Sequence, residues 1–279
     1  MTLKFSVITP SFRNSQWLKL CIASVADQRV EAEHIVQDAG SDDGTLDWLR
    51  TDSRVRAFVE KDRGMYDAIN RGLRRASGEI LAWLNCDEQY LPGALETVGA
   101  FFAQHPGIDV IFGDIVMVDA HGAYLCHRKV QTPLTYHTWT CHLSTLSCAT
   151  FFRRRIVAER GFTFDPGWRD AGDAEWMVRL LRARVKMAAL GRFTSVFTCT
   201  GANMSAAPNA RSENRKLFLS APFWARQLRP LIILHHRLRR LLGGMYSQRP
   251  FSYEIFTQAS PARRLSHPVP RPSAKPLGQ

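Results

Sequence analysis

The sequence predicts an α/β fold in which helices flank a mainly parallel sheet. Over the first hundred residues, apolar runs typical of strands alternate with amphipathic segments of helical period. A polar loop containing Gly, Asp or Pro follows each apolar run. This β-α-β-α order is typical of parallel sheets, whose strands are joined by crossover helices on both faces. Composition agrees with a globular chain, because 45% of the 279 residues are hydrophobic and 22% are charged.

The periodicity places the elements in order along the chain. Strands are expected at Lys4–Thr9, Glu33–Gln37, Val55–Glu60 and Ile80–Leu84. Helices are expected at Trp17–Ala26, Asp43–Leu49, Met65–Ala76 and from Leu91 to about His105. Later segments read as a strand at Val110–Asp119, helices at Arg154–Arg160 and Asp173–Arg184, and a strand at Phe193–Thr200. Ligands of such sheets bind beyond the carboxyl ends of the strands, so the loops there carry the candidate site.

The net charge of +12 is concentrated near the end of the sequence. From Arg211 onward there are 13 Lys or Arg residues and 2 Asp or Glu residues. This asymmetry predicts a main domain at residues 1–210 and a basic helical appendage at 211–259. Residues 260–279, rich in Pro, Ser and Arg, are expected to be disordered. A nearly neutral main domain does not indicate a nucleic-acid partner.

An amphipathic helix is expected within the appendage, at residues 230–242. Its leucines fall on one face, whereas His236, Arg237 and Arg240 fall on the other. The helix could hold the chain on an anionic membrane surface, or it could pack on the main domain. The sequence has no secretory signal pattern and no apolar window of about 20 residues, so we expect a cytoplasmic protein, peripheral on the inner face of the cell membrane if this helix binds lipid.

The cysteines are scattered and form no Cys-x-x-Cys pair. We expect buried free thiols in a chain large enough to have its own core. His137, Cys141, His142 and Cys148 come near a zinc pattern, but their spacing matches no common zinc module.

Carboxylates follow three of the four expected N-terminal strands. Asp38 ends the second strand, in a turn where it could bond a nucleobase or simply shape the loop. Asn85, Asp87 and Glu88 follow the apolar strand Ile80–Leu84. Adjacent acids at a buried strand end are unfavourable unless a cation joins them, so a hard divalent cation is the better explanation.

Four segments together resemble a known family. They are VITPSFRN, QDAGSDDGT, the long block EKDRGMYDAINRGLRRASGEILAWLNCDE, and GDAEWMVRL. In this order and spacing they are similar to the inverting glycosyltransferases of family 2, which have the GT-A (Rossmann-like) fold. The resemblance covers roughly residues 3–205 and says nothing about the tail.

The resemblance implies a nucleotide-sugar site at the strand ends. The residues implied to bind the nucleotide sugar are Thr9, Pro10, Ser11, Asp38, Asp62, Gly64, Asp67, Asn85 and Asp87. Asp38 would meet the base, usually uracil, and Asp87 with Glu88 would hold Mn²⁺ or Mg²⁺. The chain departs from the family pattern at Asn85, where an Asp is often found, and at Glu88, where a further Asp is common.

A general base is also required, because the acceptor hydroxyl must lose its proton as it attacks. Asp173 matches the family's catalytic Asp at the start of a later helix, and Glu175 is the reserve candidate. An acidic side chain in the first turn of a helix could instead have only a structural role, in which it interacts favourably with the helix dipole.

The implied function is transfer of a hexosyl or related group from a nucleotide-diphosphate sugar, in most cases a UDP-sugar, to an acceptor hydroxyl with inversion. The implied setting is bacterial surface polysaccharide biosynthesis, with a saccharide or lipid-linked acceptor. The alternative is a non-catalytic membrane- or nucleic-acid-associated binding protein on the same scaffold. The sequence has neither a Gly-x-Gly-x-x-Gly segment after its first strand nor a P-loop motif.

Overall fold

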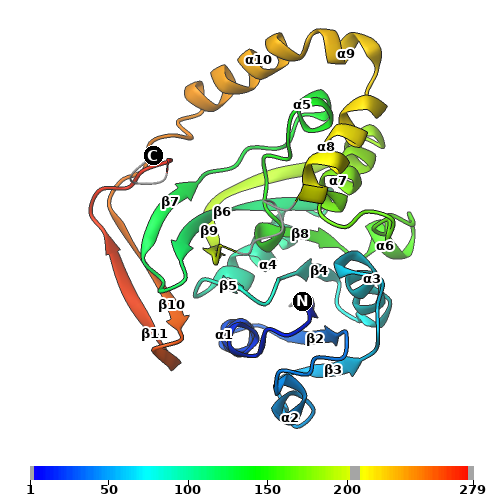
Figure 1. Cartoon of the computed structure of the whole chain (residues 1–279). Coiled ribbons are helices and arrows are strands. Elements are labelled where there is room, and N and C mark those ends of the chain that lie inside the picture. The colour runs from blue at the N-terminus through cyan, green and yellow to red at the C-terminus, as the bar shows by residue number, and fades with distance from the viewer. Residues whose placement is uncertain (1–2, 202–207, 276–279) are drawn as a thin grey trace.

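The structure, a computed structural model, describes residues 3–201 and 208–275 and confirms the α/β fold class (Figure 1). Within these residues, nine strands form one curled sheet and two further strands form a hairpin beside it. In spatial order the path of the large sheet is β3 (Arg56–Val59), β2 (Ala32–Asp38), β1 (Phe5–Ser11), β4 (Ile80–Trp83), β8 (Thr150–Arg153), β6 (Val110–Asp119), β9 (Met187–Cys199) and β5 (Glu88–Tyr90), and β7 (Tyr124–Arg128) pairs with β6 off this path.

The helices occupy the positions that the periodicity predicted, and others follow in the second half of the chain. They are α1 (Ser15–Ala26), α2 (Thr45–Leu49), α3 (Met65–Arg75), α4 (Ala94–Gln104), α5 (Thr135–Thr140), α6 (Arg155–Ala158), α7 (Gly172–Arg182), α8 (Pro208–Ser220), α9 (Phe223–Gln227) and α10 (Arg229–Leu242).

The sheet is parallel only in part. Strands β3, β2, β1 and β4 are mutually parallel, as are β6 and β9. Strand β8 runs antiparallel to both β4 and β6, while β5 pairs antiparallel with β9 and β7 with β6. The second half of the sheet is therefore mixed, which the expectation of a mainly parallel sheet did not include.

Alternation along β1 assigns helices to the two faces of the sheet. Ile8 points towards α3. A Cβ added at Gly72 of this helix would lie 2.5 Å from the Cγ2 atom of Ile8. Thr9 points the opposite way, and its hydroxyl lies 3.6 Å from the Sγ of Cys21 on α1. Successive side chains of a strand lie on opposite faces, so α1 and α3 cover opposite sides of β1.

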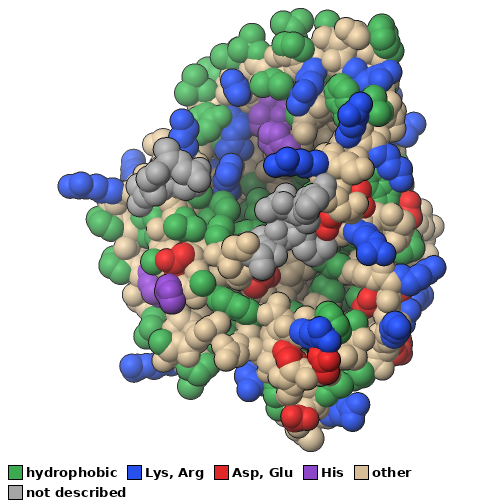
Figure 2. All heavy atoms as spheres, viewed as in Figure 1, with side chains coloured by type: hydrophobic (Ala, Val, Ile, Leu, Met, Phe, Trp, Pro, Cys, Tyr) green, Lys and Arg blue, Asp and Glu red, His purple; other side chains and the backbone are tan. Residues whose placement is uncertain are grey.

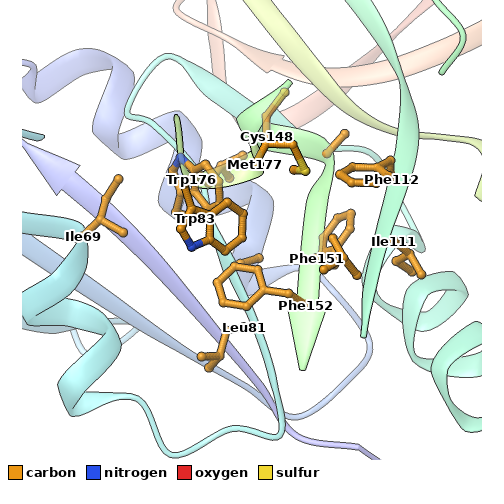
Figure 3. Close-up of a cluster of buried hydrophobic side chains, with 14 of the residues drawn as sticks. Ile69, Leu81, Trp83, Ile111, Phe112, Cys148, Phe151, Phe152, Trp176 and Met177 are labelled. Carbon is orange, nitrogen blue, oxygen red and sulfur yellow. The ribbon is translucent and has the colours of Figure 1, made fainter. Parts of the chain in front are cut away.

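An aromatic cluster holds α7 against the sheet (Figure 3). The ring of Trp83 on β4 lies 5.8 Å from Trp176 on α7 and 6.2 Å from Phe152 on β8. Phe164 stacks on Trp176 at 4.8 Å. Such offset and edge contacts add about 0.5–1.5 kcal/mol per pair beyond burial. The cluster therefore fixes the start of α7 close to the carboxyl end of β4.

The disorder expected at 260–279 is wrong for the first part of that range. Strands β10 (Phe251–Thr257) and β11 (Ser260–Val269) pair antiparallel, so the 211–259 segment is not wholly helical either. The apolar side chains of Tyr253, Ile255 and Val269 pack on the large sheet. Arg264 donates two hydrogen bonds to Asp27, at 2.6 and 2.7 Å. Residues 276–279 lie outside the described part of the chain.

The amphipathic helix expected at 230–242 is confirmed as α10, and the face that bears His236 and Arg239 is the one that packs. His236 is buried, and Arg239 donates hydrogen bonds to the carbonyl and hydroxyl oxygens of Thr132, at 2.7 and 3.1 Å. The leucine face is exposed, with Leu242 reaching 86%. In residues 3–201 and 208–275, no helix is long and apolar enough to cross a membrane.

We predict that Gly78→Ala destabilises the fold. Its Cβ would lie 2.6 Å from the carbonyl carbon of Phe5 and 2.7 Å from the amide nitrogen of Ser6, and backbone atoms of a central strand cannot yield. The expected loss in unfolding free energy is about 1–3 kcal/mol, measured by urea denaturation. Gly107→Ala is the control, because nothing lies within 4 Å of its Cβ position. Equal stability of the two variants would contradict the close approach.

Candidate active site

A cavity of about 640 Å³ opens at the carboxyl ends of β1 and β4 and at the start of α7. Seven of the residues expected to bind donor or act as base line it: Pro10, Ser11, Asp62, Gly64, Asn85, Asp87 and Asp173. The structure thus brings together residues from four separate segments of the chain. It does not bring Thr9, Asp38, Asp67, Glu88 or Glu175 into the lining.

Thr9 was expected to line the nucleotide pocket but faces the core. Its hydroxyl lies 2.8 Å from Nε2 of His34, and the side chain is completely buried. The reason is strand alternation, because Thr9 shares the face of β1 that α1 covers.

Asp38 is completely buried and organises its own loop. Its Oδ1 accepts hydrogen bonds from the amides of Gly40 and Ser41, at 2.9 and 2.7 Å. Its Oδ2 accepts from the hydroxyls of Ser11 and Ser41, both at 2.8 Å. A carboxylate has about four lone-pair sites, and these bonds use four. The geometry therefore favours a loop-ordering role over direct contact with a base, and Ala39 rather than Asp38 reaches the cavity.

Asp62 and Gly64 shape the loop after β3. The Gly64 amide donates to Oδ1 of Asp62 at 2.9 Å, and the φ of Gly64 is +124°, a conformation that favours glycine. Burial raises the pKa of Asp62. Asp67 points elsewhere, where it accepts a 2.9 Å hydrogen bond from Arg71 and another from the Arg63 amide.

Trp83, Asn85, Cys86 and Asp87 reach the cavity from the end of β4, and of these Asn85 and Asp87 carry side-chain oxygens. The Oδ1 of Asn85 is buried and finds no hydrogen-bond partner among the described residues. Burial raises the pKa of Asp87. An unpaired carbonyl oxygen beside a partly desolvated carboxylate fits the oxygen donor set of Mg²⁺ or Mn²⁺.

Glu88 was expected to be a metal ligand, but it lies below the cavity on β5 and is completely buried. Its carboxylate accepts hydrogen bonds from the Asn85 amide, at 2.8 Å, and from the Ser147 hydroxyl, at 3.3 Å. Burial and the neighbouring Asp87 raise the pKa of Glu88 to about 8. Glu88 therefore supports the turn that presents Asn85 and Asp87 rather than facing the cavity itself.

Asp173, in the first turn of α7, is held at the cavity by Tyr66. The Asp173 amide donates to the Tyr66 hydroxyl at 3.0 Å, and that hydroxyl lies 3.4 Å from Oδ1 of Asp173. Burial raises the pKa of Asp173. A raised pKa strengthens a carboxylate as a proton acceptor, which suits a general base.

Glu175 lies outside the cavity. It accepts a 2.7 Å hydrogen bond from Arg179 one turn later, so the geometry favours Asp173 over this reserve candidate.

Sequence reasoning missed four polar side chains of the lining, Asn14, Lys61, Ser147 and Asp170, together with the supporting role of Tyr66. Lys61 directly follows β3, and Tyr66 lies within a segment that carries the family resemblance, so position alone could have indicated both. Ser147 and Asp170 reach the cavity through tertiary packing, for which the sequence offers no local signal.

The sequence model of Glycosyl transferase family 2 matches residues 6–162, more than half of the chain. The chain belongs to this family. A PGL/p-HBAD biosynthesis glycosyltransferase of Mycobacterium tuberculosis is 31% identical over 168 residues, which cover 56% of this chain and 62% of that protein. Glycosyltransferase AglE of Haloferax volcanii is 27% identical over 64% of this chain and 62% of its own length. The chain thus matches about three fifths of either relative.

Solved structures confirm the GT-A fold. TarS of S. aureus, in complex with UDP-GlcNAc, superposes with a TM-score of 0.61 at 22% identity, over 77% of this chain and 65% of that one. The mannosyltransferase PcManGT of Pyrobaculum calidifontis, in complex with GDP-Man and Mn²⁺, has a TM-score of 0.55 at 15% identity, over 87% of this chain and 79% of that one.

We predict that Glu88→Gln weakens the pH dependence of stability. Folded Glu88 keeps its proton up to about pH 8, whereas the unfolded side chain loses it near its ordinary pKa. The folded state binds more protons between these values, so without metal the free energy of unfolding should fall as pH rises from about 5 to 8. Glu88 should account for on the order of 2–4 kcal/mol of this fall in the free energy of unfolding. Urea denaturation in the presence of EDTA measures it.

The exposed Glu159→Gln is the matched control for this experiment. An identical pH slope in the parent and in Glu88→Gln would show that Glu88 does not hold its proton in the folded chain.

Proposed function

We propose that this chain is a metal-dependent inverting glycosyltransferase that moves a hexosyl or related group from a UDP-sugar to an acceptor hydroxyl. The observation that carries the proposal is the cavity itself, in which Asp87 and Asn85 from the β4 end and Asp173 from α7 line one space. Its volume falls in the range of small-molecule sites, about 300–1,000 Å³. The donors bound to TarS and PcManGT are nucleotide sugars, which supports this donor class.

The donor end of the site is the group of residues at β1, β3 and β4. Asp87 and Asn85 would hold Mn²⁺ or Mg²⁺, and the Mn²⁺ of PcManGT supports this choice. Such an ion supplies charge neutralisation to a departing diphosphate. Lys61, Asp62 and Gly64 line the same space and would contact the nucleotide. The Asp38 loop would position Ala39 beside the base.

The acceptor end is at α7. Inversion requires one displacement, in which the acceptor oxygen forms a bond to the anomeric carbon as the bond to the diphosphate breaks. Asp173 would take the acceptor proton at a carboxylate oxygen, while Tyr66 and the Ala174 amide, which donates to Oδ1 at 2.8 Å, hold that side chain in place.

The acceptor is proposed to be lipid-linked or a saccharide, in the assembly of a bacterial surface polysaccharide. The supporting feature is an exposed apolar ridge along α8 to α10, seen at the upper edge of Figure 2. The ridge consists of Leu219, Phe223, Trp224, Leu228, Leu231, Leu234, Leu238, Leu241 and Leu242. Adjacent exposed Arg229 and Arg237 would add attraction to an anionic surface, about 1 kcal/mol each. The chain is accordingly proposed to act at the inner face of the cell membrane.

We predict that Asp173→Asn keeps donor affinity and loses transfer by about 10²–10⁴-fold, because the amide has the same shape but cannot accept the proton. Product formation and donor binding are measured in parallel with a panel of UDP-sugars. Glu175→Gln is the comparison and should stay near the parent rate. If Glu175→Gln is inactive and Asp173→Asn is active, the base is Glu175.

We predict that Asp87→Ala abolishes metal-dependent donor binding while the fold persists. In the parent, donor at about 100 times its dissociation constant with Mn²⁺ should add about 2.7 kcal/mol to stability, and the variant should show no such gain. The exposed Glu159→Ala should behave as the parent. A variant that still transfers sugar at more than a few per cent of the parent rate would overturn the assignment of Asp87. Absence of turnover and of donor binding in the parent would favour the non-catalytic binding protein.

We predict that the double variant Leu231→Glu/Leu238→Glu loses binding to vesicles that contain anionic lipid. Both leucines are exposed, at 61% and 47%, so the fold should tolerate the change. The control is Thr51→Glu/Gln104→Glu, which adds the same charge at exposed positions away from the ridge. Sedimentation with the vesicles measures binding. Equal sedimentation of both double variants would argue against the ridge as the membrane surface.

A further inference from the structure

Three histidines from two distant segments of the sequence meet where α10 packs on α5. His137 lies on α5, His142 follows that helix by two residues, and His236 lies on the inward face of α10. One ring nitrogen from each lies within 4.8 Å of the other two. The rings of His137 and His236 stack with centroids 3.6 Å apart, and the His142 ring is 4.7 Å from that of His137. Figure 2 shows histidine side chains gathered below α10.

The buried members of this cluster have unused hydrogen-bonding atoms. His137 and His236 are 1% and 7% exposed, and the Nδ1 of each finds no hydrogen-bond partner among the described residues. Leaving a buried polar atom unpaired costs about 1–3 kcal/mol, so a ligand that paired with these nitrogens would stabilise the cluster.

The protonation state suits a metal ligand. Burial lowers the pKa of His137 to about 3 and that of His236 to about 4, so both imidazoles are neutral at physiological pH and each offers a lone pair. Burial, followed by the charges of Arg128 and Arg240, lowers the pKa of His142, so two guanidinium groups also lie near the cluster. Their charge opposes a bound cation, and three nitrogen ligands must outweigh it.

We propose that His137, His142 and His236 form a binding site for a divalent transition metal, with Zn²⁺ the leading ion. Zinc–nitrogen bonds of about 2.1 Å require nitrogens about 3.4 Å apart in a tetrahedral site, so the nitrogens must approach from separations of up to 4.8 Å. Because imidazole lone pairs lie in the ring plane, one of the stacked rings of His137 and His236 must also tilt to face the ion. His142 is the exposed member of the cluster. A nitrogen-only donor set favours Zn²⁺ over Mg²⁺ or Mn²⁺, which separates this site from the oxygen-lined cavity.

The bound ion would join α10 to the main domain. Arg239 and Gln131 provide the hydrogen bonds across this contact, with the Gln131 amide donating to the Arg239 carbonyl at 3.2 Å. Metal bonds from His236 to His137 and His142 would fix the orientation of the helix and therefore of its exposed leucines. The site is structural, and the inference does not depend on sugar transfer.

The test uses the purified full chain, stripped with EDTA and held in excess Mg²⁺. Zn²⁺ is titrated calorimetrically, and Co²⁺ is followed by its visible absorption. We expect one Zn²⁺ per chain, a Co²⁺ spectrum typical of nitrogen ligation and a higher Tm. His142→Ala and His236→Ala should each lower Zn²⁺ affinity at least about tenfold.

Two controls make the result specific. His235→Ala removes the exposed neighbour of His236 and should bind as the parent does. Asp87→Ala alters the cavity and should leave the Co²⁺ spectrum unchanged. Because His142 is exposed, its variant should fold even if His236→Ala does not, which circular dichroism checks. No Zn²⁺ binding by the parent, or unchanged affinity in His142→Ala, would overturn the proposal.

Discussion

The parallel pairing of β1 with β2 on one side and β4 on the other is the constraint on which the candidate site depends. In this register Ser11 lies opposite Asp38, and Ile8 lies opposite Trp83. The loops after all three strands consequently emerge at one edge of the sheet. A slip of one residue would exchange the faces of Ile8 and Thr9, so packing against α3 and α1 enforces the register. The strand register that packs the core is thus also the register that brings the loops of the site together.

Carboxylates gathered at one edge of the sheet repel one another and lose hydration, and different interactions offset this cost at different residues. Asp38 is compensated by four hydrogen bonds and Asp67 by the guanidinium of Arg71. For Asp87 and Glu88 burial is the largest influence on the carboxyl group, and it raises the pKa of both. Of these two acids only Asp87 lines the cavity, where a cation would stabilise its charge, whereas Glu88, like Asp38 and Asp67, has a structural task. Position at a strand end does not distinguish the two roles, but access to the cavity does.

The order of the N-terminal elements was predictable because hydrophobic periodicity is a local signal. Strands β5 and β8 were not predicted, because these short strands lie outside the regular alternation of strands and helices that made the equally short β3 and β4 recognisable. Polar β11 resembles a disordered segment until β10 pairs with it. The family resemblance located Asp87 and Asp173 at the cavity. The direction of Thr9 followed from strand alternation and could have been predicted. The loop-ordering role of Asp38 and the approach of His236 to His137 depend on tertiary contacts that no local pattern encodes.

The hairpin β10–β11 has a consequence for the order in which the molecule forms during synthesis. Arg264 bonds Asp27 across 237 positions, and Gln89 bonds the Phe256 backbone across 167. The apolar surface of Leu91, Val116 and Val196, which this hairpin covers, is made much earlier. A nascent chain therefore carries that surface uncovered until the hairpin leaves the ribosome. Exposed apolar surface on an incomplete fold favours association with other chains, so this face is where chaperone protection during translation would matter most.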